Sequence, residues 1–358
     1  MKKLFQTEVN SRVALLVLAI IVAVALYQLG LLSPAEFTAP LLLGMSQMTP
    51  AQARVIDPIL TTAAQGYKNP DFIGDALFPT VPVEARGGKI ITFGREDFEL
   101  YSTVRAPGTA TKRVQFGYSG ASFALEDHSL EGVVPIENSQ EAAAVPGINL
   151  GNAAVRRTQN IIALRKEKAQ ADLALTAANY PASNKITLAG TDQWSDYVAA
   201  ASDPSDDIEI AKEAIRNKTG KRPNTVVLGA LVWSKLKYHP KMIDRIKYTG
   251  RDSLTLEMVA ALWEVKRVVV GDAVYMSGAG VQTDIWGKFA VLAFTEIGSL
   301  AEAGLPSYGY TYQLRGYPLA EQPYYERNPK SWIYPVSDAL QPVIASNIAG
   351  YLITGAVA

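Results

Sequence analysis

Three consecutive residues, Asp127, His128 and Ser129, have the side-chain types of a hydrolytic catalytic triad. A triad is defined by its geometry, and neighbouring residues on a strand point to opposite faces, so these three cannot act together. The second histidine, His239, precedes Pro240 at an expected helix junction, and we interpret it as a capping or packing residue. With 2 histidines in 358 residues, a histidine-based metal site or proton relay is not expected.

Two other short patterns resemble binding sites. Gly278 and Gly280 follow an expected strand, but no third glycine or helix completes a dinucleotide-binding loop, so the pattern predicts a hairpin turn. Glu126, Asp127 and Glu131 form a small acidic cluster that could bind a cation or meet a basic patch on a neighbour; we favour an exposed, solvated tip.

The composition narrows the class of protein further. The absence of cysteine excludes disulfides, thiolate nucleophiles and cysteine-bound zinc. The 34 basic and 34 acidic residues balance, which argues against a dedicated nucleic-acid binder. Apolar residues make up 48% and charged residues 19%, which indicates a chain that hides part of its surface against copies of itself. We therefore expect a protein that is not an enzyme and that has no catalytic residue, metal site or cofactor.

The N-terminal part contains an apolar run from Val13 to Tyr27 that continues to Leu32. As a helix of about 20 residues it would be roughly 30 Å long, which is enough to cross a bilayer. Three basic residues precede it: Lys2, Lys3 and Arg12. Taken alone, the run predicts a membrane helix with a cytoplasmic N-terminus. The alternatives are a helix buried in an assembly, or translated sequence absent from the working protein, whose globular part would begin near Met48.

The elements that follow are a β-rich stretch and a long helix. Residues Arg86 to Pro135 alternate apolar and polar side chains around a Pro-Gly turn, which predicts a projecting hairpin. Asn152 to Ala178 lacks glycine and proline and carries apolar residues at helical spacing, which predicts a helix of ~40 Å. One interpretation is that the charged face of this helix is simply solvated. The other is that a mildly basic face lies opposite an anionic partner. The basic residues of the face are Arg156, Arg157, Arg165, Lys166 and Lys168.

The stretch from Ser205 to Gly250 predicts a helix, a strand and two further helices. Asp206 with Glu209 resembles a capping box at the first helix, and Gly220 is typical of a helix C-cap. Further predicted elements are a helix over 257–263, strands over 225–228, 266–270 and 285–294, and a last strand within 343–353 that returns to an earlier sheet. A stretch this well specified and this poor in reactive groups indicates a building block.

Whole segments of the body resemble major capsid proteins of tailed double-stranded DNA phages, the Hong Kong 97 type. They are MTPAQARVIDPILTTAAQGY, ALFPTVPVEARGGKI, APGTATKRVQFGY, ALEDHSLEGVVP, NYPASNKITLAGTDQWSD and the stretch from Ser205 to Gly250. The resemblance implies an α+β fold, the HK97-like capsid fold, with an N-terminal arm, an extended β-hairpin loop, a peripheral domain with a long spine helix, and an axial domain.

The resemblance also implies a division of the chain. Residues 1–47 would be an apolar extension, either a scaffold-like piece that is later removed or sequence upstream of the true start, and so not part of the mature shell. Residues 48–85 would be the arm and 86–135 the extended loop. Residues 136–182 and 305–342 would form the peripheral domain, with the spine helix over 152–178. Residues 183–304 and 343–358 would form the axial domain.

The function implied is that of a major capsid protein whose hexamers and pentamers close an icosahedral shell around double-stranded DNA in the virion, assembled in the host cytoplasm. Its partners would be its own copies, non-specifically bound DNA, and scaffold, portal and decoration proteins, with no membrane in the mature form. The basic residues of the spine helix would face the DNA. Contacts between subunits through the loop are expected at Arg105, Lys112, Arg113, Glu126, Asp127 and Glu131. An encapsulin-like nanocompartment shell and a membrane-tethered binding protein are the alternatives.

Overall fold

The computed structural model describes residues 72–89, 100, 103–105, 107–108, 111, 122–143, 149–198, 201–246, 254–278, 280–296 and 307–358. These residues belong to one unit, Tyr67–Ala358. The apolar run at 13–32 and most of the expected projecting loop lie outside the described residues. None of the helices that the structure describes is long and apolar enough to cross a membrane.

A six-stranded sheet is built around the 14-residue strand β14 (Ser331–Ile344). It pairs antiparallel with four strands: β4 (Glu126–Pro135), β11 (Gly309–Leu314), β12 (Leu319–Ala320) and β13 (Tyr324–Glu326). The strand β1 (Thr80–Val83) adds parallel to the edge of β11. The β4 ladder runs from Ser331 opposite Pro135 to Leu340 opposite Glu126, so the last part of the expected hairpin region, residues 126–135, is a strand of this sheet.

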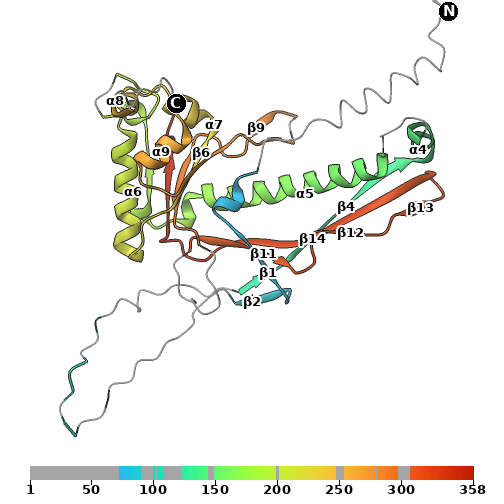
Figure 1. Ribbon diagram of the computed structural model, residues 1–358, viewed down its shortest axis with the longest axis horizontal. Helices are drawn as coiled ribbons and strands as arrows, with labels where there is room; N and C mark the ends of the chain where they lie inside the picture. The colour runs from blue at the N-terminus through green and yellow to red at the C-terminus, as the bar shows by residue number, and fades with distance from the viewer. Residues whose placement is uncertain are drawn as a thin grey trace, which may run out of the picture. The chain divides into compact units, whose positions relative to one another are not determined.

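The helix α5 (Leu150–Leu175) lies along this sheet (Figure 1). Glycines allow the close approach, since a Cβ at Gly151 would lie 2.5 Å from the Tyr334 hydroxyl and a Cβ at Gly132 would lie 3.0 Å from Ala154 Cβ. The sequence predicts this helix over 152–178; in the structure it begins at residue 150 and ends at residue 175. Its end is capped by Tyr180, whose hydroxyl donates to the Ala174 carbonyl at 2.7 Å.

A five-stranded sheet has the strand order β5-β15-β10-β6-β7. Its strands are β5 (Lys185–Thr187), β15 (Gly350–Thr354), β10 (Ala290–Ala293), β6 (Thr225–Gly229) and β7 (Arg267–Gly271). Strand β6 is buried on both faces, as its uninterrupted apolar sequence predicts. Val226 and Leu228 pack into one core with the helices, and Val227 packs into a second core that includes Ala171 and Ala174 of α5.

The helices around this sheet are α6 (Pro204–Thr219), α7 (Ala230–Leu236), α8 (Pro240–Ile246) and α9 (Leu256–Leu262). The predicted capping box of α6 is wrong. The N-cap is Asp203, whose carboxylate accepts from the Ser205 and Asp206 backbone N–H groups, and Pro204 is the first helical residue. The predicted C-cap is confirmed, because Gly220 adopts φ of 66°.

Two predicted strands differ from the observed ones. The stretch 285–294 is not one strand, because a turn at Gly287, with φ of 49°, separates Ile285 from β10. The stretch 343–353 is divided between the end of β14 and the start of β15, and β15 does return to a sheet that contains earlier strands.

The remaining described elements are short. The helix α4 (Ile136–Ala143) follows β4, and 3₁₀ turns occupy Gly74–Ala76, Ala177–Asn179, Ala182–Asn184 and Gly190–Asp192. Two small antiparallel hairpins pair β2 (Gly87–Lys89) with β3 (Ser122–Ala124) and β8 (Val274–Met276) with β9 (Gln282–Asp284). The second confirms the predicted turn around Gly280, whose φ is 75°.

Candidate functional site

The segment that precedes β1 is bound by α5 almost as a docked peptide would be. Phe78 is fully buried, and its ring centroid lies 5.4 Å from that of Tyr308. Gly309 makes room for this ring, because a Cβ there would lie 2.5 Å from Phe78 Cδ1. The segment then continues as β1 along the edge of β11, so apolar packing and backbone pairing hold its second half.

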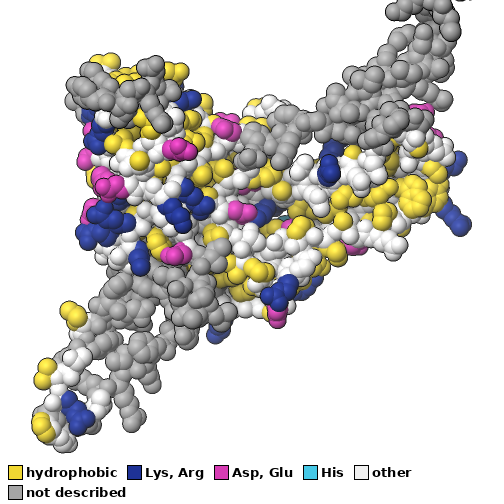
Figure 2. All heavy atoms as spheres, viewed as in Figure 1, with side chains coloured by type: hydrophobic (Ala, Val, Ile, Leu, Met, Phe, Trp, Pro, Cys, Tyr) yellow, Lys and Arg dark blue, Asp and Glu magenta, His cyan; other side chains and the backbone are white. Residues whose placement is uncertain are grey.

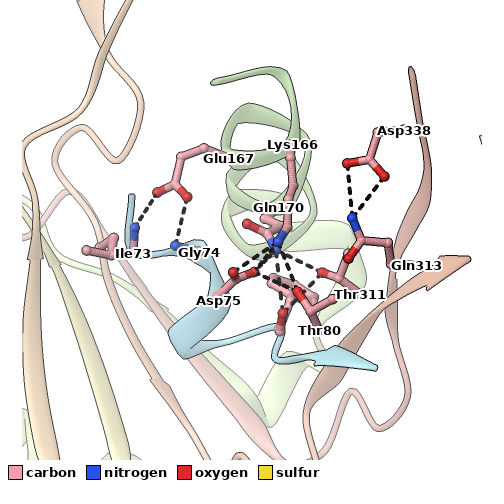
Figure 3. Close-up of polar contacts among 11 residues, drawn as sticks. Ile73, Gly74, Asp75, Thr80, Lys166, Glu167, Gln170, Thr311, Gln313 and Asp338 are labelled. Atoms are coloured by element: carbon pink, nitrogen blue, oxygen red, sulfur yellow. Dashed lines mark hydrogen bonds and ion pairs between the residues drawn. The ribbon is translucent and has the colours of Figure 1, made fainter. Parts of the chain in front are cut away.

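Glu167 holds the first half of the segment (Figure 3). Its Oε1 accepts the Ile73 N–H at 3.0 Å and its Oε2 accepts the Gly74 N–H at 2.8 Å. A third donor comes from the other side, because the Trp286 indole N–H reaches Oε1 at 2.7 Å. Glu167 is only 1% exposed. Burial raises the pKa of its carboxyl group, and the three hydrogen bonds act against this rise.

Lys166 and Gln170 hold the side chains of the same segment. Lys166 Nζ lies 2.7 Å from Asp75 Oδ1 and donates to the Thr80 hydroxyl at 2.9 Å. The Gln170 amide donates to Asp75 Oδ1 at 2.9 Å and to the Thr311 hydroxyl at 2.8 Å. Figure 3 shows these groups converging on one point beside α5. We call this set the polar junction: Asp75, Thr80, Lys166, Glu167, Gln170 and Thr311.

The residues of the polar junction hold segments of the chain in position. Each donor meets an acceptor on another element, and the set includes neither a cysteine nor a histidine. Among the described residues, no three histidine, aspartate or glutamate side chains come together as metal ligands would. The junction therefore fixes the segment before β1, the helix α5 and the strand β11 against one another, and Glu167 also joins them to the turn at Trp286.

The five basic residues predicted to form one face of the helix have different surroundings. Arg156, Arg157 and Arg165 are exposed on α5. Lys166 belongs to the polar junction, while Lys168 pairs with Asp172 and lies 5.1 Å from the centroid of the Tyr275 ring. The three arginines are therefore the part of the predicted face that is open to an external anion.

The acidic residues predicted near the loop lie on strand β4. All three are exposed, as predicted, but they do not form a tip, because they lie along β4 where it pairs with β14. Asp127 forms an ion pair with Arg86 at 2.5 Å, and Glu131 accepts from the Tyr324 hydroxyl at 3.2 Å.

Of the basic residues predicted near the loop, one is described. Arg105 donates to the Thr111 hydroxyl at 3.1 Å. Lys112 and Arg113 lie outside the described residues.

The two histidines have the structural surroundings that the sequence predicts. His128 lies on β4 opposite Asp338, beside Asp127 and Ser129 in an extended strand, which rules out a triad of these three neighbours. His239 is 2% exposed, and its Nε2 lies 3.1 Å from the Ser202 hydroxyl. The packing role predicted for His239 is confirmed.

The sequence contained a signal for the polar junction that was overlooked. Glu167, Gln170, Ala171 and Ala174 are spaced as one face of a helix, and two of the four are alanines. A polar pair that shares a face with small residues indicates close packing against another element rather than solvent.

Comparison with known proteins adds to this geometry. Residues 177–332 match the family model described as Phage major capsid protein E. The major capsid protein of Burkholderia phage BcepMu is 38% identical over 309 residues, which cover 85% of this chain and 98% of that protein. The chain belongs to the phage major capsid protein family.

Solved structures agree with this membership. The crystal structure of a phage-related protein from Bordetella bronchiseptica is 45% identical to this capsid protein, with a TM-score of 0.67 over 84% of this chain and 97% of that one. The capsid structure of cyanophage P-SCSP1u has a TM-score of 0.54 at 11% identity, over 81% of this chain and 89% of that one, and so shows the fold alone. The predicted α+β, HK97-like capsid fold and the predicted capsid identity are both confirmed.

Proposed function

We propose that this capsid protein assembles with its own copies into hexamers and pentamers, and that these close an icosahedral shell around double-stranded DNA. The observation that carries the proposal is the match to a phage major capsid protein over 98% of that protein's length. The protein would act without catalysis, because its described polar clusters position segments. Its place would be the virion, after assembly in the host cytoplasm, with scaffold, portal and decoration proteins as further partners.

The two sheets support a division of the subunit into two domains. In this proposal the six-stranded sheet with α5 is the peripheral domain, and the five-stranded sheet with its helices is the axial domain. The segment before β1 is the end of the N-terminal arm, and the hairpin that starts at β2 and β3 is the extended loop. The polar junction lies where arm, peripheral domain and axial domain meet, so it would set their relative positions in each subunit.

An uncovered apolar surface supports self-association. Apolar side chains gather at the end of the six-stranded sheet where β13 lies (Figure 2). Val133 is 57% exposed, and Trp332, 37% exposed, has its ring centroid 5.6 Å from that of Tyr325. Exposed apolar patches of this kind mark contact surfaces between proteins. Charged contacts between copies are proposed at Arg105, Lys112, Arg113, Glu126, Asp127 and Glu131, with Asp127 already paired to Arg86 within the subunit.

The DNA contact is proposed at the exposed face of the spine helix, at Arg156, Arg157 and Arg165. Contacts from arginine to phosphate would be independent of base sequence, as packaging of any DNA requires. Lys166 and Lys168 would take little part, because each is already paired with an aspartate of its own chain.

The test is expression of the full-length protein followed by electron microscopy of the particles. Closed icosahedral shells are the expected product, and a protein that stays monomeric or pellets with lipid vesicles would refute the assembly proposal. For the DNA contact, Arg156, Arg157 and Arg165 are changed together to glutamate and filled and empty particles are counted during infection. The filled fraction should fall while the total yield of shells is kept.

A matched control changes three exposed basic residues elsewhere, Lys221, Lys288 and Arg327, to glutamate, with the same change in net charge. If both triple variants lower the filled fraction equally, the effect comes from net charge and the proposed DNA contact is wrong.

A further inference from the structure

His239 is a buried histidine at the turn between α7 and α8. Its backbone is fixed, because its N–H donates to the Leu236 carbonyl at 3.1 Å and its own carbonyl accepts from Met242 and Ile243, each at 3.0 Å. Its side chain is 2% exposed and lies against Ser202 and Tyr197, in the described stretches 193–198 and 201–203. The ring is therefore held from both sides, by its own turn and by the segment above it.

The hydrogen bonds around Ser202 determine which nitrogen of the ring carries the proton. The Ser202 hydroxyl lies 2.9 Å from the Gln193 carbonyl, which can only accept, so the single hydroxyl proton is used there. Nε2 of His239, 3.1 Å from the same hydroxyl oxygen, must then be the donor. Nδ1 is left without a proton, and within the described residues it has no hydrogen-bond partner.

A second proton has no acceptor in this arrangement. Protonation would place an N–H on Nδ1, in a buried position where nothing among the described residues accepts it. Uptake of a proton therefore favours conformations in which the ring leaves its site or the segment above it opens.

The charged and titratable groups around the ring come from each element that packs on it. Asp203, the N-cap of α6, favours protonation of the ring, while Lys241 of α8 opposes it and pairs with Asp203 at 3.4 Å. The Tyr197 ring meets His239 edge-on at 6.0 Å, and Tyr238 precedes it in the turn. Burial is the largest influence, and the pKa of His239 is lowered from its ordinary value of 6.5.

The described residues above His239 are tied down at several points. The Trp194 N–H donates to the Ala356 carbonyl at 2.8 Å, the Tyr197 hydroxyl donates to the Lys235 carbonyl at 2.9 Å, and Ser202 is bound to both Gln193 and His239. The tie from Ser202 ends on a titratable ring, so it is the tie that a proton can change.

We propose that His239 and Ser202 form a proton-sensitive clasp, which holds residues 201–203 on the α7–α8 turn when the ring is neutral and frees them when the ring is protonated. A lowered pKa in the folded state means that the stabilisation is present above about pH 6.5 and is lost as the pH falls below it. The clasp would thus control the start of α6, whose N-cap Asp203 follows Ser202 directly. It does not depend on the proposed shell assembly.

The experiment is amide hydrogen exchange of the full-length protein, read on the peptide over 194–203 at about pH 7.5 and about pH 5 and corrected for the intrinsic effect of pH. In the wild type we expect the corrected exchange to be several-fold faster at the lower pH, because protonation of the buried ring opens the clasp. His239→Gln keeps an N–H donor toward Ser202 and does not titrate, so the rise should disappear. Ser202→Ala should exchange fast at both pH values.

His128→Gln is the matched control, because it removes the other histidine of the chain, and it should behave as the wild type. A wild type without the rise, or a His239→Gln variant that keeps it, overturns the proposal. A readout that needs no variant is exchange at the C2 position of the two histidines in the wild type. The titration midpoint of His239 should lie below its ordinary value of 6.5, and a midpoint at or above that value overturns the proposal.

Discussion

Trp286 donates its indole N–H to Glu167 across 2.7 Å, and this hydrogen bond joins the helix α5 to the turn that leads into β10. Both side chains are almost fully buried. Glu167 uses its remaining acceptor capacity on the Ile73 and Gly74 backbone N–H groups. One carboxylate with no cation among its hydrogen-bond partners thus links three segments of the capsid protein. Burying a carboxylate without a paired cation costs free energy, so we infer that Glu167 serves to hold these segments in position.

Glu167→Gln should destabilise the fold. The amide supplies one oxygen and one NH₂ group, so at least one of the three buried donors loses its acceptor. An unsatisfied buried donor costs about 1–3 kcal/mol, and we expect the free energy of unfolding to fall by that amount in denaturant titrations of the full-length protein. Glu126→Gln, at an exposed position of β4, is the control and should change the free energy of unfolding by less than about 0.5 kcal/mol. Equal effects of the two changes would mean that the bonds to Glu167 contribute little.

Gly74→Ala tests how closely the segment before β1 approaches α5. The added Cβ would lie 2.0 Å from Gln170 Oε1 and 2.7 Å from Glu167 Oε2. Gln170 is held through the hydrogen bonds of its Nε2, and Glu167 Oε2 accepts the Gly74 N–H, so the two side chains cannot move away freely. We expect a loss of roughly 1–3 kcal/mol in unfolding free energy, the usual cost of overpacking. The control is Gly278→Ala, where a Cβ meets no atom within 4 Å. Its thermal midpoint should stay at that of the wild type, and a similar loss in both variants would contradict the predicted clash.

Tyr180 and Tyr308 should respond unequally to loss of their hydroxyl groups. The two oxygens lie 2.5 Å apart, and the Tyr180 hydroxyl also lies 2.7 Å from the Ala174 carbonyl. Since that carbonyl can only accept, Tyr180 donates to it and Tyr308 donates to Tyr180. Tyr180→Phe leaves a buried donor on Tyr308 unsatisfied and should cost about 1–3 kcal/mol, whereas Tyr308→Phe leaves no donor unsatisfied and should cost less. The reverse order in denaturant unfolding would show that the donor assignment is wrong.

The same pair makes the fold sensitive to alkali. Burial is the first cause that raises the pKa of both tyrosines above the ordinary value of 10.0. In the unfolded chain they ionise near that value, while in the folded protein they keep their protons. Their contribution is therefore complete below about pH 10 and falls as the pH rises further, by up to about 1.4 kcal/mol per pH unit for each group. Unfolding free energies measured on both sides of pH 10 should fall less steeply in a double Phe variant, and an unchanged slope would refute this.

The elements that depend on local sequence were predictable, and the contacts between distant segments were not. The strand of Thr225–Leu228 and the Gly220 C-cap follow from patterns within a few residues, and both are observed. The N-cap of α6 was missed although Asp203 followed by Pro204 is itself a start signal. Glu167 looked like one more charge on a solvated helix, because its three donors lie about 93, 94 and 119 positions away in the chain.

The ion pair beside the β2–β3 ladder consists of two exposed side chains whose charges can be exchanged. Arg86 and Asp127 lie 2.5 Å apart, next to the β2–β3 ladder, and the Leu125 N–H donates to the Arg86 carbonyl at 2.8 Å. The Asp127 carboxylate raises the pKa of Arg86, so the guanidinium stays charged in the range in which the protein would be studied. Arg86→Glu places two carboxylates together, and we expect faster amide exchange of the peptide over 122–127 and fewer closed shells.

The reciprocal exchange, Arg86→Asp with Asp127→Arg, restores opposite charges at the same place. If the pair acts through its charges, the double variant should recover slow exchange and the yield of shells, while each single change stays impaired. Exposed pairs are screened by salt, so the defect of Arg86→Glu should shrink as the ionic strength rises. A double variant as impaired as the single ones would show that side-chain shape rather than charge matters here. A defect that salt leaves unchanged would contradict the electrostatic account.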